Sequence, residues 1–145
     1  MNVDAILQNK GNAVETARPD WNVAQVCQRL NELEVGALLV SKGGQSVNGI
    51  VSERDVINHI AKEGAAVLDR PVSDIMIHDV VTCTRDDDIA HLMETMTERR
   101  IRHLPVVEND VLIGIFSIGD VVNVRGYFPV NCGGRFSMNA VRPSL

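Results

Sequence analysis

Two short motifs in this chain of 145 residues place a hydroxyl three positions before a carboxylate. The pairs are Ser52 with Asp55 and Ser117 with Asp120. A carboxylate can accept hydrogen bonds from both hydroxyls of a ribose, and a serine at a helix start suits phosphate or ribose oxygens. The same spacing is that of a capping box, whose only task is to start a helix. Both interpretations stay open, because one pair of residues can satisfy both.

A basic segment in the second half of the chain could hold an anion. It comprises Arg99, Arg100, Arg102 and His103. An arginine guanidinium can bind two phosphate oxygens in one plane. We expect the first two arginines to pair instead with acids on an exposed helix face, namely Glu94 or Glu98. Arg102 and His103 then remain as candidates, and the first motif carries its own cation, Arg54.

The chain contains no recognisable catalytic or metal-binding pattern. It has no nucleophile elbow, no phosphate-binding loop and no HExxH sequence. The acids Asp86–Asp88 could suggest Mg²⁺, but three acids at a helix start are explained more simply by the helix dipole. His59, His78 and His91 do not cluster in the sequence. We therefore expect no catalytic residue and no metal site.

Composition excludes several classes of protein. The net charge is −5, and all 19 acids lie within residues 1–125, which argues against nucleic-acid binding. No apolar run is long enough to span a bilayer, and the start of the chain does not resemble a signal peptide. The three cysteines form no CxxC pair and favour a reducing compartment: Cys27, Cys83 and Cys132. We expect a cytoplasmic protein that contacts neither membrane nor nucleic acid.

An internal repeat organises most of the chain. The segment Gly49–Val56 recurs as Gly114–Val121 at an offset of 65 positions. Upstream, Val35–Val40 aligns with Ile101–Val106 at an offset of 66. The offset falls from 66 to 65 because the second copy is one residue shorter between these two segments. Gly and polar residues indicate a turn there, and insertions and deletions are best tolerated at turns. The chain therefore predicts two copies of one structural unit.

Each copy begins with a short strand and an amphipathic helix. In the first copy, Asp20 or Asn22 can cap a helix whose apolar stripe runs from Val23 to Leu33. In the second copy, we expect Asp86–Asp88 to lie in the first turn of the equivalent helix.

Two apolar strands and a second helix complete each copy. The predicted hairpins are Ala37–Val40 with Gly49–Val51, and Leu104–Val107 with Val111–Phe116. The serines of the two motifs start the second helix, whose buried stripe in the first copy is expected to be Val56, Ile57 and Ile60. A β-α-β-β-α unit of about 60 residues is marginal alone, so the copies should pack together. The predicted division is 3–66, 67–125, and a tail, 126–145, to which no role is assigned.

The duplicated motifs resemble the CBS domain pair, also called a Bateman module. The resemblance rests on Val35–Val40 with Gly49–Asp55, and on Ile101–Val107 with Gly114–Asp120. It covers nearly the whole chain except the tail. It implies a mixed α+β/α/β fold of two pseudo-symmetric β-α-β-β-α CBS units packed through their sheets.

The resemblance also implies a ligand and the residues that bind it. Family members mostly bind adenosyl compounds (AMP, ADP, ATP, S-adenosylmethionine, NAD(H)) in clefts between the copies. It implies ribose contacts from Asp55, Asp120, Ser52 and Ser117, phosphate contacts from Arg54, Arg102 and His103, and an adenine slot at Thr16, Thr82 and Ala37. For the threonines, ordinary β-propensity is the alternative explanation.

From the resemblance we expect a non-catalytic regulatory module that senses cellular energy. An AMP-like or NAD-like nucleotide would be its regulatory ligand, with no obligatory cofactor, and a protein not yet identified would be its target. A homodimer is expected, since such pairs commonly associate. The alternatives are a ligand-free dimerisation or scaffold module and, less favoured, a small nucleotide-processing enzyme.

Overall fold

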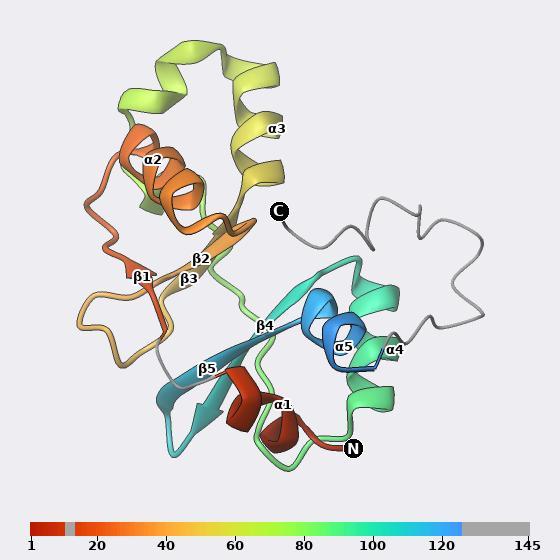
Figure 1. The fold of residues 1–145 in the computed structure, drawn as a ribbon. Helices are drawn as coiled ribbons and strands as arrows, with labels where there is room; N and C mark the ends of the chain where they lie inside the picture. Colours follow the sequence, from red (N-terminus) through yellow and green to blue (C-terminus); the bar gives the residue numbers. More distant parts are fainter. Residues whose placement is uncertain (11–13, 126–145) are drawn as a thin grey trace.

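The computed structural model describes residues 1–10 and 14–125, and the tail lies outside the described residues (Figure 1). In chain order the elements are α1 (Val3–Lys10), β1 (Thr16–Ala17), α2 (Val23–Leu33), β2 (Ala37–Val40), β3 (Gly49–Ser52), α3 (Glu53–Glu63), the 3₁₀ turns η1 (Ala65–Asp69) and η2 (Val72–Asp74), α4 (Ile89–Arg99), β4 (His103–Glu108), β5 (Val111–Ser117) and α5 (Ile118–Arg125). Among these helices, none is both long and apolar enough to cross a lipid bilayer.

The two halves of the chain repeat one topology. In the first, β1 runs parallel to β2, and β2 pairs antiparallel with β3. In the second, β4 pairs antiparallel with β5. Cys83 forms a parallel bridge to Val106 in β4, at the position equivalent to that of β1 beside β2. The halves meet through their hairpins, since the Leu112 N–H donates to the Gln45 carbonyl at 2.8 Å. The predicted fold of two CBS-like units packed through their sheets is confirmed.

One prediction about the helix starts is confirmed and another is wrong. Asn22, rather than Asp20, caps α2, and its side chain and that of Gln25 exchange hydrogen bonds with each other's N–H groups. The expected position of Asp86–Asp88 in the first turn of α4 is wrong, because the helix begins after them at Ile89. The start of the chain binds this segment, and the Ile89 N–H donates to the Met1 carbonyl at 3.1 Å.

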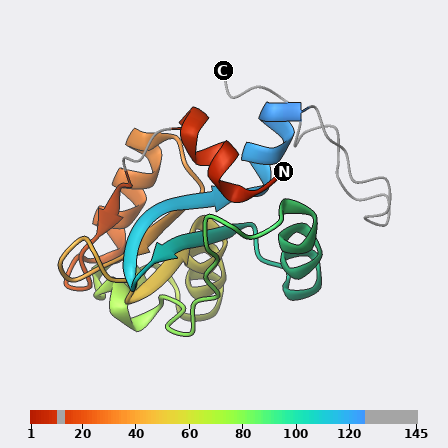
Figure 2. The same ribbon diagram turned by 90° about the horizontal axis from the view of Figure 1, so that it is seen from below.

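Each hydrophobic core includes residues from both halves of the chain, which the sequence analysis divided at residue 66. The first core contains Val67, Val72, Ile75 and Met76 together with α2, β2 and β3. The second core contains Val3, Ile6 and Leu7 of α1 together with α4, β4 and β5. Figure 2 shows α1 beside α5 and across β5. Each core therefore contains residues from both sides of this boundary.

The glycine that opens each repeated motif makes room for these closing segments. A Cβ on Gly114 would lie 2.6 Å from Cδ2 of Leu7 in α1. A Cβ on Gly49 would lie 2.6 Å from the Met76 sulfur and 2.9 Å from the Ile77 carbonyl oxygen. Equivalent positions of the repeat thus provide equivalent spaces, which explains why the motif needs glycine there.

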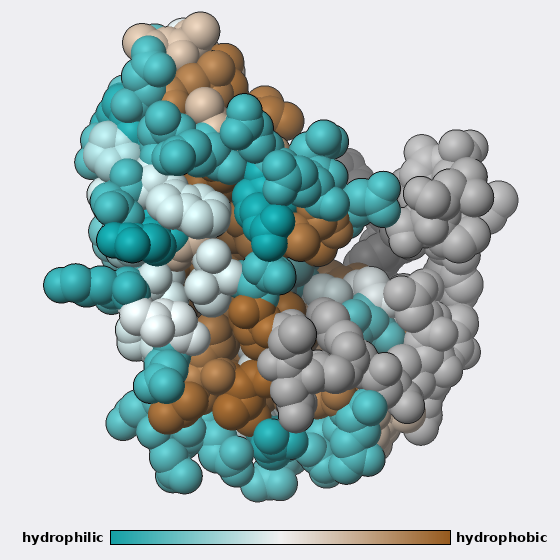
Figure 3. Space-filling view, turned by 60° about the vertical axis from the view of Figure 1, so that its left-hand side comes forward, coloured by the Kyte–Doolittle hydropathy of each residue, from teal (hydrophilic) through white to brown (hydrophobic). Residues whose placement is uncertain are grey.

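The predicted buried stripe of α3 is partly wrong. Val56 is buried and Ile60 packs against the first core, but Ile57 is 63% exposed. Its side chain lies on the face of α3 turned away from that core. Hydrophobic residues also reach the surface over both units on the face drawn in Figure 3.

The close approach at Gly49 can be tested by substitution. Gly49→Ala should lower the free energy of unfolding by about 1–3 kcal/mol, because the added methyl meets a backbone carbonyl that a hydrogen bond from Ile50 holds in place. Gly114→Ala should cost less, since the far end of the Leu7 side chain can move. Urea unfolding measures both, with Gly43→Ala as control because nothing lies within 4 Å of its Cβ position. Equal stabilities of the Gly49 and Gly43 variants would refute this explanation.

Candidate functional site

The first Ser–Asp motif joins β3 to α3 without a loop. The Ser52 N–H and hydroxyl both donate to Oδ2 of Asp55 at 2.8 Å, and the Asp55 N–H donates to Oγ of Ser52 at 3.2 Å. These reciprocal bonds confirm the capping interpretation. The other carboxylate oxygen, Oδ1 of Asp55, makes no hydrogen bond to any of the residues that the structure describes. It can therefore accept a hydrogen bond from a ligand hydroxyl while the cap stays intact.

The second motif repeats this geometry between β5 and α5. The Ser117 N–H donates to Oδ2 of Asp120 at 2.9 Å, and the Asp120 N–H donates to Oγ of Ser117 at 3.3 Å. All four motif residues are half-buried. The contact of either aspartate with a ribose stays a prediction, because capping neither requires nor prevents it.

Strand register places other predicted site residues beside the two motifs. Ala37 lies opposite Ser52, and His103 lies opposite Ser117. Ala37 is buried and His103 is half-buried. The residues predicted from unrelated parts of the sequence thus gather at the ends of the two hairpins.

The two predicted threonines are less alike than the repeat suggests. Thr16 is half-buried and lies in β1 opposite Leu39, whereas Thr82 is exposed and precedes the bridging Cys83. Strand pairing alone accounts for Thr16, so its place in an adenine slot stays a prediction.

The two units approach each other at Gly36, just before β2. Oε1 of Glu53 lies 3.5 Å from the point where a Cβ on Gly36 would stand, and Cε1 of His103 lies 3.9 Å from the same point. A carboxylate of the first unit and an imidazole of the second therefore converge on one glycine. Sequence reasoning missed Glu53, although its position between Ser52 and Asp55 was a signal for it.

Some arginines are already paired and others are not. Within residues 1–10 and 14–125, ion pairs with nearby carboxylates are formed by Arg18, Arg29, Arg70 and Arg85. The predicted phosphate ligands Arg54 and Arg102 are exposed, and within residues 1–10 and 14–125 neither forms an ion pair. They are thus available to an anionic ligand.

The expected pairing of Arg99 and Arg100 with Glu94 or Glu98 is wrong, since the described part of the chain shows no such pairs. Helical side chains meet at spacings of three or four positions, which none of these combinations has. Arg100 also leaves the helix, because it adopts the left-handed conformation that ends α4.

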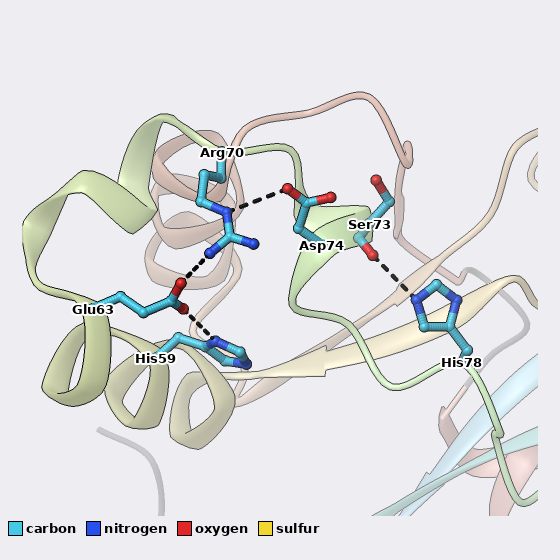
Figure 4. Close-up of polar contacts among 6 residues, drawn as sticks. All are labelled: His59, Glu63, Arg70, Ser73, Asp74 and His78. Atoms are coloured by element: carbon cyan, nitrogen blue, oxygen red, sulfur yellow. Dashed lines mark hydrogen bonds and ion pairs between the residues drawn. The ribbon is translucent and has the colours of Figure 1, made fainter.

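An ion-pair chain fastens the end of α3 to the segment that leads into the second unit (Figure 4). Glu63 accepts from His59 at 3.0 Å and pairs with Arg70, which also binds Asp74 at 3.3 Å. The hydrogen bond from His59, with help from Arg70, lowers the pKa of the Glu63 carboxyl. His78 bonds separately to the Ser73 carbonyl, so His59 and His78 each have local structural partners.

The two described cysteines are poor nucleophiles. Burial, together with the charge of Asp87, raises the pKa of the Cys83 thiol to about 12. Burial also raises the pKa of Cys27. Both thiols are free and stay protonated near neutral pH, and the thiolate is the reactive form.

Comparison with known proteins matches both halves of the chain to one family. The family model of the CBS domain matches residues 11–62 and again residues 72–127. A mitochondrial CBS domain-containing protein of Arabidopsis thaliana is 33% identical over 128 residues, covering 83% of this chain and 62% of that protein. The chain spans 59–65% of the length of the first three curated relatives.

Solved structures show the same fold. The crystal structure of a CBS-domain protein from Agrobacterium tumefaciens is 41% identical, with a TM-score of 0.83 over 86% of this chain and 99% of that one. The CBS domain pair of the protein MJ0100, solved with 5′-methylthioadenosine and S-adenosyl-L-methionine, has a TM-score of 0.75 at 20% identity. It covers 86% of this chain and 98% of its own, and at that identity it shows the fold alone.

The cap at Ser52 predicts a measurable contribution to stability. Ser52→Ala should lower the free energy of unfolding by about 1 kcal/mol, because the Asp55 N–H at the helix start loses its acceptor. Ser46→Ala is the matched control, since Ser46 is exposed and makes one long bond of 3.3 Å to Asn48. Chemical denaturation compares the two variants, and equal effects would contradict a capping role.

Proposed function

The chain belongs to the CBS-domain family, and from this we propose a regulatory module that binds an adenosyl nucleotide between its two units. One observation carries the proposal: each unit holds a half-buried aspartate at the same strand-to-helix junction. At Asp55, one carboxylate oxygen is used by the cap and the other is open to a ligand. A ribose diol needs such an acceptor on a rigid support.

The remaining contacts of the ligand follow from the residues around these junctions. Arg54 and Arg102 would hold phosphate, supported by their exposure and by the absence of competing ion pairs in the described ranges. His103 would assist them, since it lies where the units meet. The adenosyl ligands named for MJ0100 support the adenosyl group in general. We propose an AMP-like or NAD-like ligand, so that the module would report on cellular energy.

The proposed ligand acts by binding and undergoes no reaction. A nucleotide that contacts both units would favour one packing of the units over another, and an exposed surface would pass this change to a target protein. The ligand is regulatory rather than an obligatory cofactor. The two free thiols favour a reducing compartment, for which we propose the cytoplasm.

Nucleotide binding is tested by calorimetry with AMP, ADP, ATP, NAD and S-adenosylmethionine. Asp55→Asn and Asp120→Asn should each weaken binding about 10- to 100-fold at their own site, because a charged acceptor to ribose is lost. Asparagine keeps an oxygen for the serine N–H, so stability should change little.

Glu98→Gln is the control for this experiment, since Glu98 is an exposed acid on α4 away from the motifs. If no adenosyl compound binds at millimolar concentration, the scaffold alternative replaces the proposal. Turnover of a bound nucleotide would show an enzyme instead.

We also propose that a second copy of the chain covers a groove on the first unit. The groove lies between α2 and α3, has a volume of about 480 Å³, and is bordered by Ile57 and Val35, which are 63% and 42% exposed. Glu34 lies at its edge, and the equivalent position of the second unit is Arg100. These opposite charges favour a head-to-tail pair, in which the first unit of one copy meets the second unit of the other.

The homodimer is tested by analytical ultracentrifugation. Ile57→Glu should convert the dimer to monomer, because it buries a charge in the apolar groove, whereas Val111→Glu, at an exposed site on β5, should not. Glu34→Arg and Arg100→Glu should each weaken the dimer, and their combination should restore it. A wild-type monomer, or failure of the combined variant to recover, would contradict the head-to-tail arrangement.

A further inference from the structure

The groove proposed to receive a second copy is acidic, whereas the equivalent face of the second unit is basic. The charged residues that line the groove are Glu34 and Glu53, and both are exposed. The repeat places Arg100 at the position of Glu34. It places Arg102 at the position of Gly36, at the same offset of 66 residues. Both arginines are exposed, and the described residues hold no ion-pair partner for either. Acids on one unit therefore match cations on the other.

Backbone hydrogen bonds show that Gly36 and Arg102 occupy equivalent places in the structure as well. The Glu53 N–H donates to the Gly36 carbonyl at 3.0 Å, and the Ile118 N–H donates to the Arg102 carbonyl at 3.1 Å. Each of the two acceptor residues directly precedes the first strand of its hairpin, β2 or β4. An isoleucine thus stands in the second unit where Glu53 stands in the first. The side chain of Arg102 therefore begins beside an apolar residue of its own unit rather than beside an acid.

The position of Gly36 borders two surfaces at once. It lines the groove between α2 and α3 together with Glu53, whose Oε1 lies 3.5 Å from the Cβ point of the glycine. His103 of the other unit approaches the same point, with Cε1 at 3.9 Å, so the space between the units begins there. By the repeat, Arg102 stands where the helical face of the second unit meets that space. Its long, exposed side chain can reach either a ligand between the units or a second copy on the helical face.

The head-to-tail arrangement makes these two uses compete. It brings the helical face of the second unit of one copy onto the acidic groove of the other, and so brings Arg102 toward Glu53. Arg102 is also the proposed ligand of the nucleotide phosphate. A guanidinium that binds phosphate oxygens in its plane presents less charge and fewer N–H groups to a carboxylate of another copy. The phosphate and the second copy therefore compete for one cation.

We infer that phosphorylated ligands weaken the head-to-tail dimer by withdrawing Arg102 from Glu53 of the second copy. A nucleotide with a 5′ phosphate shifts the chain toward the monomer, whereas an adenosyl ligand without phosphate leaves the dimer intact. Linkage makes the effect reciprocal, so dilution to the monomer strengthens the binding of the phosphorylated ligand by the same factor. This inference rests on the proposed function, since it states how the proposed ligand regulates the proposed dimer.

Analytical ultracentrifugation of the full chain measures the dissociation constant of the dimer without ligand and with saturating adenosine, AMP or ATP. Adenosine should change this constant by less than about twofold. AMP should raise it about fivefold or more, and ATP by a larger factor, since couplings between sites are typically about 5- to 150-fold. Calorimetry at protein concentrations below and above the dissociation constant should show the matching increase in AMP affinity on dilution.

Glu53→Gln tests the contact itself. It should weaken the unliganded dimer severalfold and abolish the difference between adenosine and AMP, because Arg102 has no carboxylate left to lose. The AMP affinity of the dilute monomer should stay unchanged, because Glu53 belongs to the groove. Glu53→Arg and Arg102→Glu should each weaken the unliganded dimer, and their combination should restore it. Asp110→Asn is the control, because it removes one exposed acid in the turn between β4 and β5, outside the groove.

A dimer that AMP and adenosine affect equally, or that AMP strengthens, would overturn this inference and leave the proposed nucleotide site standing. Failure of the combined variant to dimerise would overturn it too. If calorimetry shows that no adenosyl compound binds, the proposed function fails first, and a monomeric unsubstituted chain would remove the proposed dimer. In either case the inference fails with the proposal on which it rests.

Discussion

The reciprocal hydrogen bonds between serine and aspartate at each strand-to-helix junction are the constraint on which the rest of the structure depends. Ser52 is both the last residue of β3 and the cap of α3, so no loop separates the sheet from the helix. The bonds to Asp55 satisfy N–H groups that a helix start otherwise leaves unpaired. They also fix a carboxylate at the edge of the sheet before any ligand arrives, which reduces the cost of ordering a binding site.

A second constraint links the two units. The segment that closes the first core leaves it through Ile77, whose peptide group exchanges hydrogen bonds of 2.9 and 3.0 Å with that of Ile50. Ile50 lies in β3, two residues before Ser52. The strand that ends at a proposed ligand site therefore also holds the exit of the linker, and α1 closes the second core in return. A ligand that orders the end of β3 acts on a strand to which the connection between the units is already bonded.

The sequence predicted those features that depend on local pattern and on the repeat. The helical spacing from Val23 to Leu33 defined α2 with its correct ends, and both hairpins lie where the apolar runs placed them. The exposure of Ile57 could not be predicted, because helical periodicity marks an apolar face without showing how much of it a neighbour covers. The convergence of Glu53 and His103 on Gly36 joins residues 50 positions apart, and only the packing of the units brings them together.

The duplicated junctions also show which positions are free to differ. Serine and aspartate serve the cap in both units, so their replacement carries a cost in stability even without a ligand. Glu53 and Ile118 contribute only a backbone N–H to the equivalent bond, and Gly36 and Arg102 contribute only a carbonyl. That bond therefore places no demand on the exposed side chains of Glu53 and Arg102, whereas the side chain of Ile118 packs against the second core. Differences between the two units are expected at such exposed positions, where the repeated hydrogen bond holds the backbone constant.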